Sequence, residues 1–474
     1  MAWDNDGYHT HHQPAQGGIL QVQASHSIVP VFDDPNLVSA AGLSPVLALG
    51  DRAGLSGLLA KHFSVPGGNA GVKVRSVVAG MLAGADDIDG LDVLRAGGMA
   101  RLLGTVRAPS TIGAFLRSLT YGHCLQLGAV NRRLVAGLDR VVPSLISSQG
   151  PVLVDLDDTV REVHGYQKQA VAYGYNKTKG LNAILATIST DHSAPVIAQC
   201  GLRRGNIRSG AKSGWHAERA LPLAREVAGD RPVLLRADSA FCMHQIVKAA
   251  QKAGCWFSLT IPAWKTVTRA ISEIREEAWQ AIEYPHAVFD DEAGQWISDA
   301  EVAEIPFTAF TSRPQAEHVT CRLVVRRVKR LGGAAWAGQD ELFATYRYHA
   351  FITNSTLTAV DADRRHRGHA IVEQVIAELK GGPLAHLPSK SFSANMAWLA
   401  CAVLAFNLSR AAAHAAGIGK ARMATIATTI IRVPGRLASR SRKLIVHLPR
   451  NWPAKQQWMR LHATANAPPP ATTP

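Results

Sequence analysis

The hydrophobic and polar positions divide the chain into a helical first part and a mixed second part. From about residue 44 to 145, apolar residues recur at helical spacing, as in the run Ile112–Leu119, where positions 112, 115, 116 and 119 are apolar. This pattern predicts an all-helical region, which we place at 39–147.

From residue 151 the period shortens to that of strands. Apolar runs bounded by turn residues predict strands at 152–160, 181–190, 194–202, 232–241 and 255–261. Helical patterns separate the later strands, in "WHAERALPLAREVAG" and again up to about residue 254. Three strands, a helix and then strand–helix–strand predict an α/β fold with a mixed sheet.

The stretch 263–345 mixes charged turns with β-like runs such as "HVTCRLVVRRVKR", which predicts a β-rich insertion. Strand character returns in "YRYHAFITN", and a long helix is expected from about residue 364. We therefore predict one catalytic domain built from 150–262 and 346–415. The polar ends at 1–38 and 463–474 are predicted to be disordered.

The composition is that of a globular protein with two or three domains, with 474 residues, 47% hydrophobic and 18% charged. No signal peptide is recognisable and the six cysteines are scattered, so we expect reduced thiols and a cytoplasmic location. The apolar run "MAWLACAVLAF" (396–406) is expected to be too short for a membrane span and to be closed by Asn407.

The charge is unevenly distributed along the chain. Net charge is +15, and 13 of the 51 Lys and Arg residues follow Glu378, whereas none of the 36 acids does. A one-sign segment of this kind favours a polyanion such as nucleic acid, although it is also compatible with a solvated surface. We predict a basic DNA-binding tail at 416–462. Its expected DNA contacts are Arg432, Arg436, Arg440, Arg442 and Lys443.

Two predicted strand ends carry aspartates. In "VLVDLDDTV", Asp155 and Asp157 are alternate residues and share one face of the strand, and Asp238 ends a later strand in "LLRADSAF". Like charges in such positions repel unless a cation lies between them. These aspartates therefore indicate a metal site.

A third acid lies in the helix "RRHRGHAIVEQVIAELKGG". At 100° per residue, His366, His369 and Lys380 fall within about 40° of Glu373, so the helix has a polar stripe. Glu378 is the alternative acid, but it points about 140° away from Glu373. On its own, such a stripe is also compatible with a solvated helix face.

Three carboxylates from two strand ends and a helix can hold two divalent ions about 4 Å apart, an arrangement that serves phosphodiester displacement. Carboxylates favour Mg²⁺. No phosphate-binding GxxxxGK[ST] loop, zinc-ligand spacing or GxSxG elbow is present in the sequence.

These motifs resemble the DDE transposases of bacterial insertion sequences, in the group numbered thirteen-eighty. The matching stretches include "LVDLDDTVREVHGYQKQAVAYGYN", "LRRGNIRSGA", "VLLRADSAF", "HRGHAIVEQVIAELK" and "SFSANMAWLACAVLAFNLSR". The resemblance implies a ribonuclease-H-like catalytic domain, with Asp157, Asp238 and Glu373 as catalytic and metal-binding residues.

The resemblance also implies two Mg²⁺ ions, with Mn²⁺ as a substitute, and cut-and-paste transposition. The expected partner is double-stranded DNA, both terminal inverted repeats and target, bound by a homodimer at the bacterial nucleoid without a membrane. In the insertion, Trp279, Trp296 and Trp336 are candidates for stacking on a flipped base.

The sequence departs from the family near the last acid. Relatives carry a Tyr–Arg–Glu–Lys signature, whereas here His366 and His369 occupy the Tyr and Arg places; Arg367 is adjacent and Lys380 is kept. We assign these four residues and Asp155 supporting roles.

Two other interpretations stay open at this point. The stretch "DLDDT" also resembles the DxDxT signature of haloacid-dehalogenase-type phosphatases, in which Asp155 is the nucleophile, Asp157 is the acid/base, and Asp290 and Asp291 are possible partners. The third interpretation is a catalytically inactive, transposase-derived DNA-binding protein.

Overall fold

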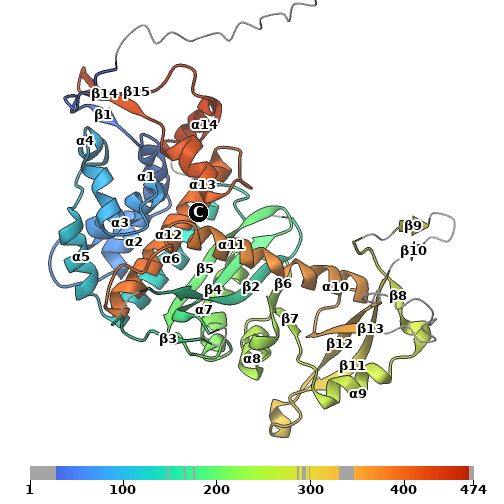
Figure 1. The fold of residues 1–474 in the computed structure, drawn as a ribbon. Helices are drawn as coiled ribbons and strands as arrows, with labels where there is room; N and C mark the ends of the chain where they lie inside the picture. Colours follow the sequence, from blue (N-terminus) through green and yellow to red (C-terminus); the bar gives the residue numbers. More distant parts are fainter. Residues whose placement is uncertain are drawn as a thin grey trace, which may run out of the picture. The chain divides into compact units, whose positions relative to one another are not determined.

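The computed structural model (Figure 1) describes residues 28–146, 149–164, 167–174, 177–285, 288–290, 295–297, 299–329 and 346–468. Residues 1–27 and 469–474 of the ends predicted to be disordered lie outside the described residues, and so does Trp336. The prediction is wrong for Leu37–Val38, which form a strand, and for residues 463–465, which end a helix.

The first part of the chain is helical, as predicted. Its helices are α1 (Leu43–Arg52), α2 (Leu55–His62), α3 (Ala70–Ala83), η1 (Asp89–Arg95), α4 (Met99–Leu103), α5 (Pro109–Ser118) and α6 (Tyr121–Val141). Helix α6 begins with a capping box, in which Thr120 and His123 each satisfy the other's backbone N–H. Helix α5 begins with Pro109, whose fixed φ suits a first helical turn.

The second part contains a mixed sheet, which confirms the prediction of an α/β fold with a mixed sheet. Its strands are β2 (Val152–Glu162), β3 (Ala172–Tyr173), β4 (Lys179–Thr190), β5 (Ser193–Arg203), β6 (Val233–Ala237), β7 (Trp256–Thr260), β8 (Gln280–Ala281), β11 (Ala300–Ala309), β12 (Val319–Lys329) and β13 (Tyr346–Thr353). In the described residues these ten strands have the order β3–β4–β2–β6–β7–β13–β12–β11–β8, and β5 also pairs with β4. Strand β2 is parallel to β6, which is parallel to β7, and the other pairs are antiparallel.

The insertion continues the main sheet rather than forming a sheet of its own. Strand β13 pairs with β7 on one side and with β12 on the other, and β12 leads on to β11 and β8. Helix α9 (Lys265–Ser272), the short helices η3 (Glu276–Ala278) and η4 (Gln315–Glu317), and the two-stranded pair β9 (Val288–Asp290) and β10 (Gln295–Ile297) complete its described part.

Helices cover the sheet (Figure 1). Helix α7 (Ser213–Ala228) contacts β2, β4 and β5, and after the short turn η2 (Ser239–Phe241), α8 (His244–Lys252) contacts α7 and β7. The helix predicted from about 364 is three consecutive elements, α10 (Ala359–Arg367), the 3-10 turn η5 (Gly368–Ala370) and α11 (Ile371–Lys380). Helix α10 contacts β11 and β12, whereas α11 contacts β2.

Helix α12 (Phe392–Ala415) lies at the centre of the fold, where it contacts α1, α3, α5, α6 and β5. It is long and apolar enough to cross a membrane, but its apolar window is fully buried within the protein. Asn407 ends the apolar run in the sequence but not the helix, which continues to Ala415. Asn407 is buried, its Oδ1 accepts from the Ile197 N–H (2.8 Å) and its Nδ2 donates to Asn131 Oδ1 (2.8 Å).

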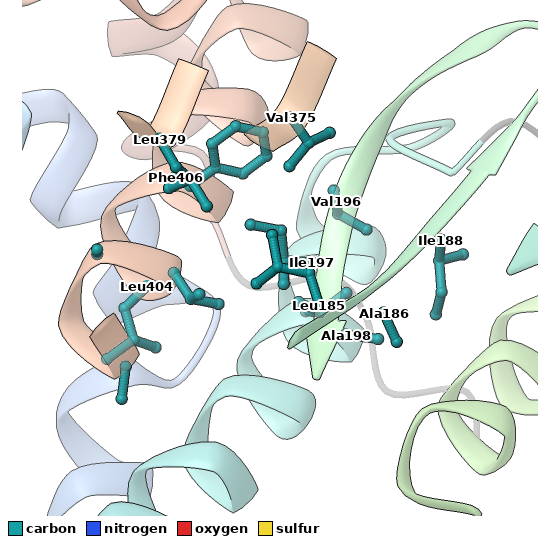
Figure 2. Close-up of a cluster of buried hydrophobic side chains, with 14 of the residues drawn as sticks. Leu185, Ala186, Ile188, Val196, Ile197, Ala198, Val375, Leu379, Leu404 and Phe406 are labelled. Carbon is teal, nitrogen blue, oxygen red and sulfur yellow. The ribbon is translucent and has the colours of Figure 1, made fainter. Parts of the chain in front are cut away.

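One hydrophobic core joins the helical part and the sheet. Figure 2 shows side chains that three elements contribute to this core: Val375 and Leu379 of α11, Leu404 and Phe406 of α12, and Val196 and Ile197 of β5. The same cluster includes buried residues of α1 to α6. The sequence change near residue 148 therefore marks a change of structural class and not a boundary between two cores.

The basic segment after residue 416 is folded, which corrects the expectation of a tail. It contains α13 (Met423–Ile426), the π-helical turn η6 (Ala427–Ile431), the hairpin β14 (Gly435–Arg440) and β15 (Lys443–His447), and α14 (Lys455–Ala465). Strand β14 pairs with β1 (Leu37–Val38), and α14 contacts α1 and α12. The buried side chains of Trp458 and Leu461 belong to the shared core.

Candidate active site

The register of two parallel strands places two of the predicted acids side by side. In the pairing of β2 with β6, Asp155 lies opposite Arg236 and Leu156 opposite Ala237. Asp157 is the next residue of β2, which continues to Glu162, so the prediction that Asp157 ends its strand is wrong; Asp238 follows the last residue of β6. At Asp238 the chain leaves the sheet, because the side chain caps η2 by accepting from the Ala240 N–H (2.9 Å). The two carboxylates therefore lie at the same edge of the parallel part of the sheet.

Both carboxylates are held in an environment that disfavours their charge. Burial raises the pKa of Asp157 to about 6, and the negative charges of Asp238 and Asp158 act in the same direction. Burial also raises the pKa of Asp238, with a further contribution from Asp158. The N–H of Asp158, which donates to Asp157 Oδ1 (2.7 Å), offsets only part of this penalty. A divalent cation bound between two such carboxylates would relieve the repulsion of their charges.

Asp155 lies one step behind this pair and is completely buried. Arg236 donates to both of its oxygens, from Nε to Oδ1 (2.7 Å) and from Nη2 to Oδ2 (2.7 Å). Burial alone would raise the pKa of Asp155, but the charge of Arg236 and the hydrogen bond from His369 outweigh it and hold the pKa low. Asp155 is therefore an ionised structural anion with no exposed surface.

His369 connects this anion to the acid pair. Its Nδ1 donates to Asp155 Oδ1 over 3.0 Å. Burial alone would lower the pKa of His369, but the hydrogen bond to Asp155 and the charge of that carboxylate raise it, with a smaller contribution from Asp157. Asp155 thus favours the imidazolium form of His369 beside Asp157 and Asp238.

Helix α11 carries the third predicted acid. The helix is joined to β2 near both ends, through the bond from His369 to Asp155 and through Lys380 Nζ, which donates to Thr159 Oγ1 (2.9 Å). Glu373 lies between these anchors and is exposed. Within the described parts of the chain, no three His, Cys, Asp or Glu side chains are grouped so that they could hold a metal ion. The structure brings Asp157 and Asp238 together, and Glu373 is not gathered with them.

The other residues predicted around Glu373 have different surroundings. The ring of His366 is stacked on Phe351 (centroids 4.2 Å apart) and hydrogen-bonded to the hydroxyls of Ser258 and Thr260. Arg367 pairs with Asp363 (2.9 Å). These two residues belong to the packing of α10 and not to the acid pair.

The alternative acid is engaged elsewhere. Glu378 forms an ion pair with Arg410 and accepts from the Met423 N–H (2.7 Å). Its carboxylate therefore holds α11 to α12 and α13.

Asp158 is a site residue that the sequence interpretation left without a role. It points to the face of β2 opposite Asp155 and Asp157, where it forms an ion pair with Arg203 and accepts from Asn182 and Ser209. The available signal was the alternation of the strand, which separates Asp158 from Asp157, together with the unexplained arginines of "LRRGNIRSGA".

The predicted DNA contacts of the basic segment lie on or beside the hairpin. Arg436, Arg440, Arg442 and Lys443 are exposed on β14, β15 and their turn. Arg432, which precedes the hairpin, donates from Nε to the Ala83 carbonyl (2.7 Å) and so joins the segment to α3. In the insertion, Trp279 packs against the Arg327 guanidinium (4.3 Å).

Comparison with protein families decides the identity of the chain. The model described as "Transposase DDE domain group 1" matches residues 20–467. The chain belongs to this family of DDE transposases. This result confirms the resemblance at the level of the family, and it leaves the thirteen-eighty group a prediction.

Comparison of the transposase with curated protein sequences found no match. Among solved structures, it is similar to one described as a cryo-EM structure of the piggyBac transposase synaptic complex with hairpin DNA. The identity is 8% and the TM-score 0.39, with 81% of this chain and 80% of that chain covered.

The family match and the buried state of Asp155 together exclude the phosphatase interpretation. A nucleophilic carboxylate must reach its substrate, whereas Asp155 is 0% exposed and both its oxygens are bonded to Arg236. Asp290 is described only as a backbone position of β9, and Asp291 lies outside the described residues.

Proposed function

We propose that this transposase cuts the DNA at the ends of its own insertion sequence and joins the freed ends to a target. The observation that carries the proposal is the pair Asp157 and Asp238, which lie where the parallel pairing of β2 with β6 ends and have raised pKa values. Cleavage and transfer of a phosphodiester need divalent cations at one site. Two carboxylates that repel each other can supply the first ligands of such a site.

The strand order supports a ribonuclease-H-like catalytic domain. Antiparallel β5, β4 and β2 are followed by parallel β6 and β7, and Asp157 lies within β2 whereas Asp238 follows β6. The site occurs where strand β2 has the antiparallel neighbour β4 on one side and the parallel neighbour β6 on the other. This arrangement fits the catalytic role that we assign to the two aspartates.

The donor set fits a hard divalent cation. Asp157 and Asp238 would hold it, and Glu373 would add the third carboxylate from α11, which is why we assign all three to catalysis. Two Mg²⁺ ions, or Mn²⁺ in their place, supply activation of the attacking oxygen and stabilisation of the leaving oxygen when bound. His369 places a positive charge beside the same pair.

DNA recognition is assigned to the helical region and to the basic segment. The exposed cations of the hairpin suit a phosphate backbone, and the ligand that we propose is the duplex of the terminal inverted repeat, with target DNA as the second substrate. Because both ends of an element must be processed together, we propose that a homodimer acts on the DNA.

The test is cleavage of a labelled duplex that carries the inverted repeat, with Mg²⁺ present. Asp238→Ala should abolish cleavage and leave binding intact, including binding in EDTA. Asp230→Ala is the matched control, because Asp230 is an exposed aspartate in the turn before β6. If Asp238→Ala cuts at the wild-type rate, the site assignment is wrong.

The same assay addresses the inactive, DNA-binding alternative. The observation that favours this alternative is the exposed Glu373, which the structure does not gather with the two aspartates. Under the proposed function, Glu373→Gln removes cleavage. If the wild-type protein binds the duplex and cuts nothing in Mg²⁺ or Mn²⁺, the chain is a DNA-binding protein only.

A further inference from the structure

A buried ionic cluster lies directly behind the acid pair, on the opposite face of β2. Asp158 accepts from Asn182 Nδ2 (2.9 Å) and from Ser209 Oγ (3.0 Å), and it forms an ion pair with Arg203. The side chains of Arg203 and Asp158 are only 5% and 12% exposed. Removing two charges from water is costly, so the cluster indicates that its geometry serves a purpose.

The cluster holds a loop in place. Arg203 Nη1 donates to the carbonyls of Ser209 (2.8 Å) and Ala211 (2.9 Å), and its Nε donates to Asn182 Oδ1 (2.8 Å). The segment 204–212, "RGNIRSGAK", is therefore bound at its far end to β2 through Asp158 and to β5 through Arg203. We call this segment the basic loop.

Two glycines bring the basic loop close to the rest of the site. A Cβ at Gly205 would lie 2.0 Å from the Gly180 carbonyl oxygen, so only glycine allows this approach to β4. A Cβ at Gly210 would lie 2.8 Å from the carbonyl oxygen of Ala240, two residues after Asp238. The loop thus borders the turn that positions Asp238.

The basic loop presents three cations to solvent. Arg204, Arg208 and Lys212 are exposed, and none of them forms an ion pair in the described structure. The segment contains no acid. The backbone that carries these cations is held by Arg203 and Asp158 and lies against the turn after Asp238, which distinguishes the loop from an ordinary solvated turn.

We propose that the basic loop binds phosphates of the DNA strand that enters the site, and so sets which phosphodiester meets Asp157 and Asp238. The proposal rests on the proposed function. The ligand is the DNA backbone rather than a base sequence, because guanidinium and ammonium groups on an exposed loop match phosphate oxygens. Asp158 is a positioning residue, which acts through Arg203 on the loop.

The test compares DNA binding and cleavage in variants of the exposed cations. Each of Arg204→Ala, Arg208→Ala and Lys212→Ala should lower the slope of log K against log salt by about 1, and the triple variant by about 3. The loss should be equal for the inverted repeat and for a scrambled duplex, because phosphates carry no sequence. Cleavage by the triple variant should fall and spread over neighbouring phosphodiesters.

Two controls distinguish the effect of a side chain's charge from the effect of its position in the basic loop. Arg208→Lys keeps the charge and should keep the slope. Lys252→Ala removes an exposed cation at the far end of α8 and should change neither slope nor cut position. If the triple variant keeps the wild-type slope and cut position, the proposal is wrong.

The positioning role of Asp158 is tested by combining variants. Asp158→Asn should reproduce the change in slope and cut position, and it should add nothing in the triple-Ala background. Because Asp158→Asn leaves the Arg203 cation buried with less compensation, the surface variants decide the matter if it does not fold. Asp238→Ala reports on the proposed function separately, since loss of cutting there leaves the salt slope of the basic loop measurable.

Discussion

The carboxylate of Asp155 is shared between His369, whose Nδ1 lies 3.0 Å from Oδ1, and Arg236, which binds both oxygens. The pairing explains how a histidine serves at a place where related transposases are expected to carry arginine. The neighbouring anion raises the pKa of His369 and so favours its cationic form beside the acid pair.

The first prediction concerns this cation. His369→Asn removes the positive charge next to Asp157 and Asp238, and groups that orient or support a metal site typically change activity by about 10- to 100-fold. We expect cleavage to fall by that factor, whereas Asp157→Asn abolishes it. His369→Arg restores a permanent cation and should recover most of the rate. Equal rates for the Asn and Arg variants would contradict the role of the charge.

The second prediction concerns the stability of the acid pair without metal. The pKa of Asp157 is raised to about 6, so the ionised carboxylate opposes folding at neutral pH. After allowance for solvent screening, we expect Asp157→Asn to raise the free energy of unfolding in EDTA by about 1–2 kcal/mol.

Mg²⁺ should reverse this order. It should raise the melting temperature of the wild-type protein by binding the folded state, and raise that of Asp157→Asn much less. Thermal unfolding with and without Mg²⁺ measures both effects. A variant that is less stable than wild type in EDTA would show that Asp157 has a structural role instead.

The third prediction is the direction of acid destabilisation. Burial lowers the pKa of His366 to about 3, and the charges of His369 and Arg236 act in the same direction. The folded state therefore binds fewer protons than the unfolded state between about pH 6.5 and 3, so stability present at neutral pH is lost as the pH falls through this window. At about pH 5.5 the loss from this residue is about 1.4 kcal/mol.

Urea unfolding at several pH values tests this sign. His366→Gln should be less stable than wild type at pH 8, and the difference should shrink as the pH falls. His386→Gln, a change at an exposed histidine, serves as the control. A difference that is constant with pH would mean that His366 titrates normally in the folded state.

The fourth prediction concerns the turn of the hairpin. Ser441 and Arg442 both have positive φ, 50° and 64°, in a two-residue turn between Arg440 and Lys443. Such a turn favours Asn and Gly, and a left-handed residue of another type costs about 1–2 kcal/mol. Arg442→Asn should therefore stabilise the fold and, at the same time, lower the salt slope of DNA binding by about 1.

A gain in stability together with a lower salt slope would show that Arg442 contacts DNA and is not needed for folding. A stabilised variant with an unchanged salt slope would remove Arg442 from the DNA interface. Deletion after Ala416 is the poorer test, because it removes Trp458 and Leu461 from the shared core and is expected to unfold the protein.

The sequence predicts the main strands of the catalytic part and the proximity of Asp157 to Asp238, because both follow from period-2 patterns. Asp155 and Asp157 share a face, and parallel pairing of their strand with β6 brings Asp238 to the same edge. The position of Glu373 could not be obtained in this way. A rotation of 100° per residue assumes one continuous helix, whereas the turn at 368–370 is 3-10 and Gly368 lies against Arg236.

The folded basic segment was missed for a related reason. Its charge suggested solvent exposure, yet its strands alternate, with Leu437 buried and Arg436 exposed. The pairing partner, Leu37–Val38, is about 400 residues away in a stretch with no strand period of its own. The local sequence pattern does not reveal the pairing of these two strands, because they come together only in the folded chain.

The continuation of the catalytic sheet into the insertion has a mechanical consequence. The helical segment that carries Glu373 is attached to the sheet at two places. Helix α10 is bound to β12 through Asp363 and Arg326 (2.7 Å), and the region of α11 is bound to β2 through His369 and Lys380. The short turn at 368–370 joins these two attachments, one to the insertion and one to β2. We therefore expect a displacement of β11 and β12 to change the position of Glu373 relative to Asp157 and Asp238.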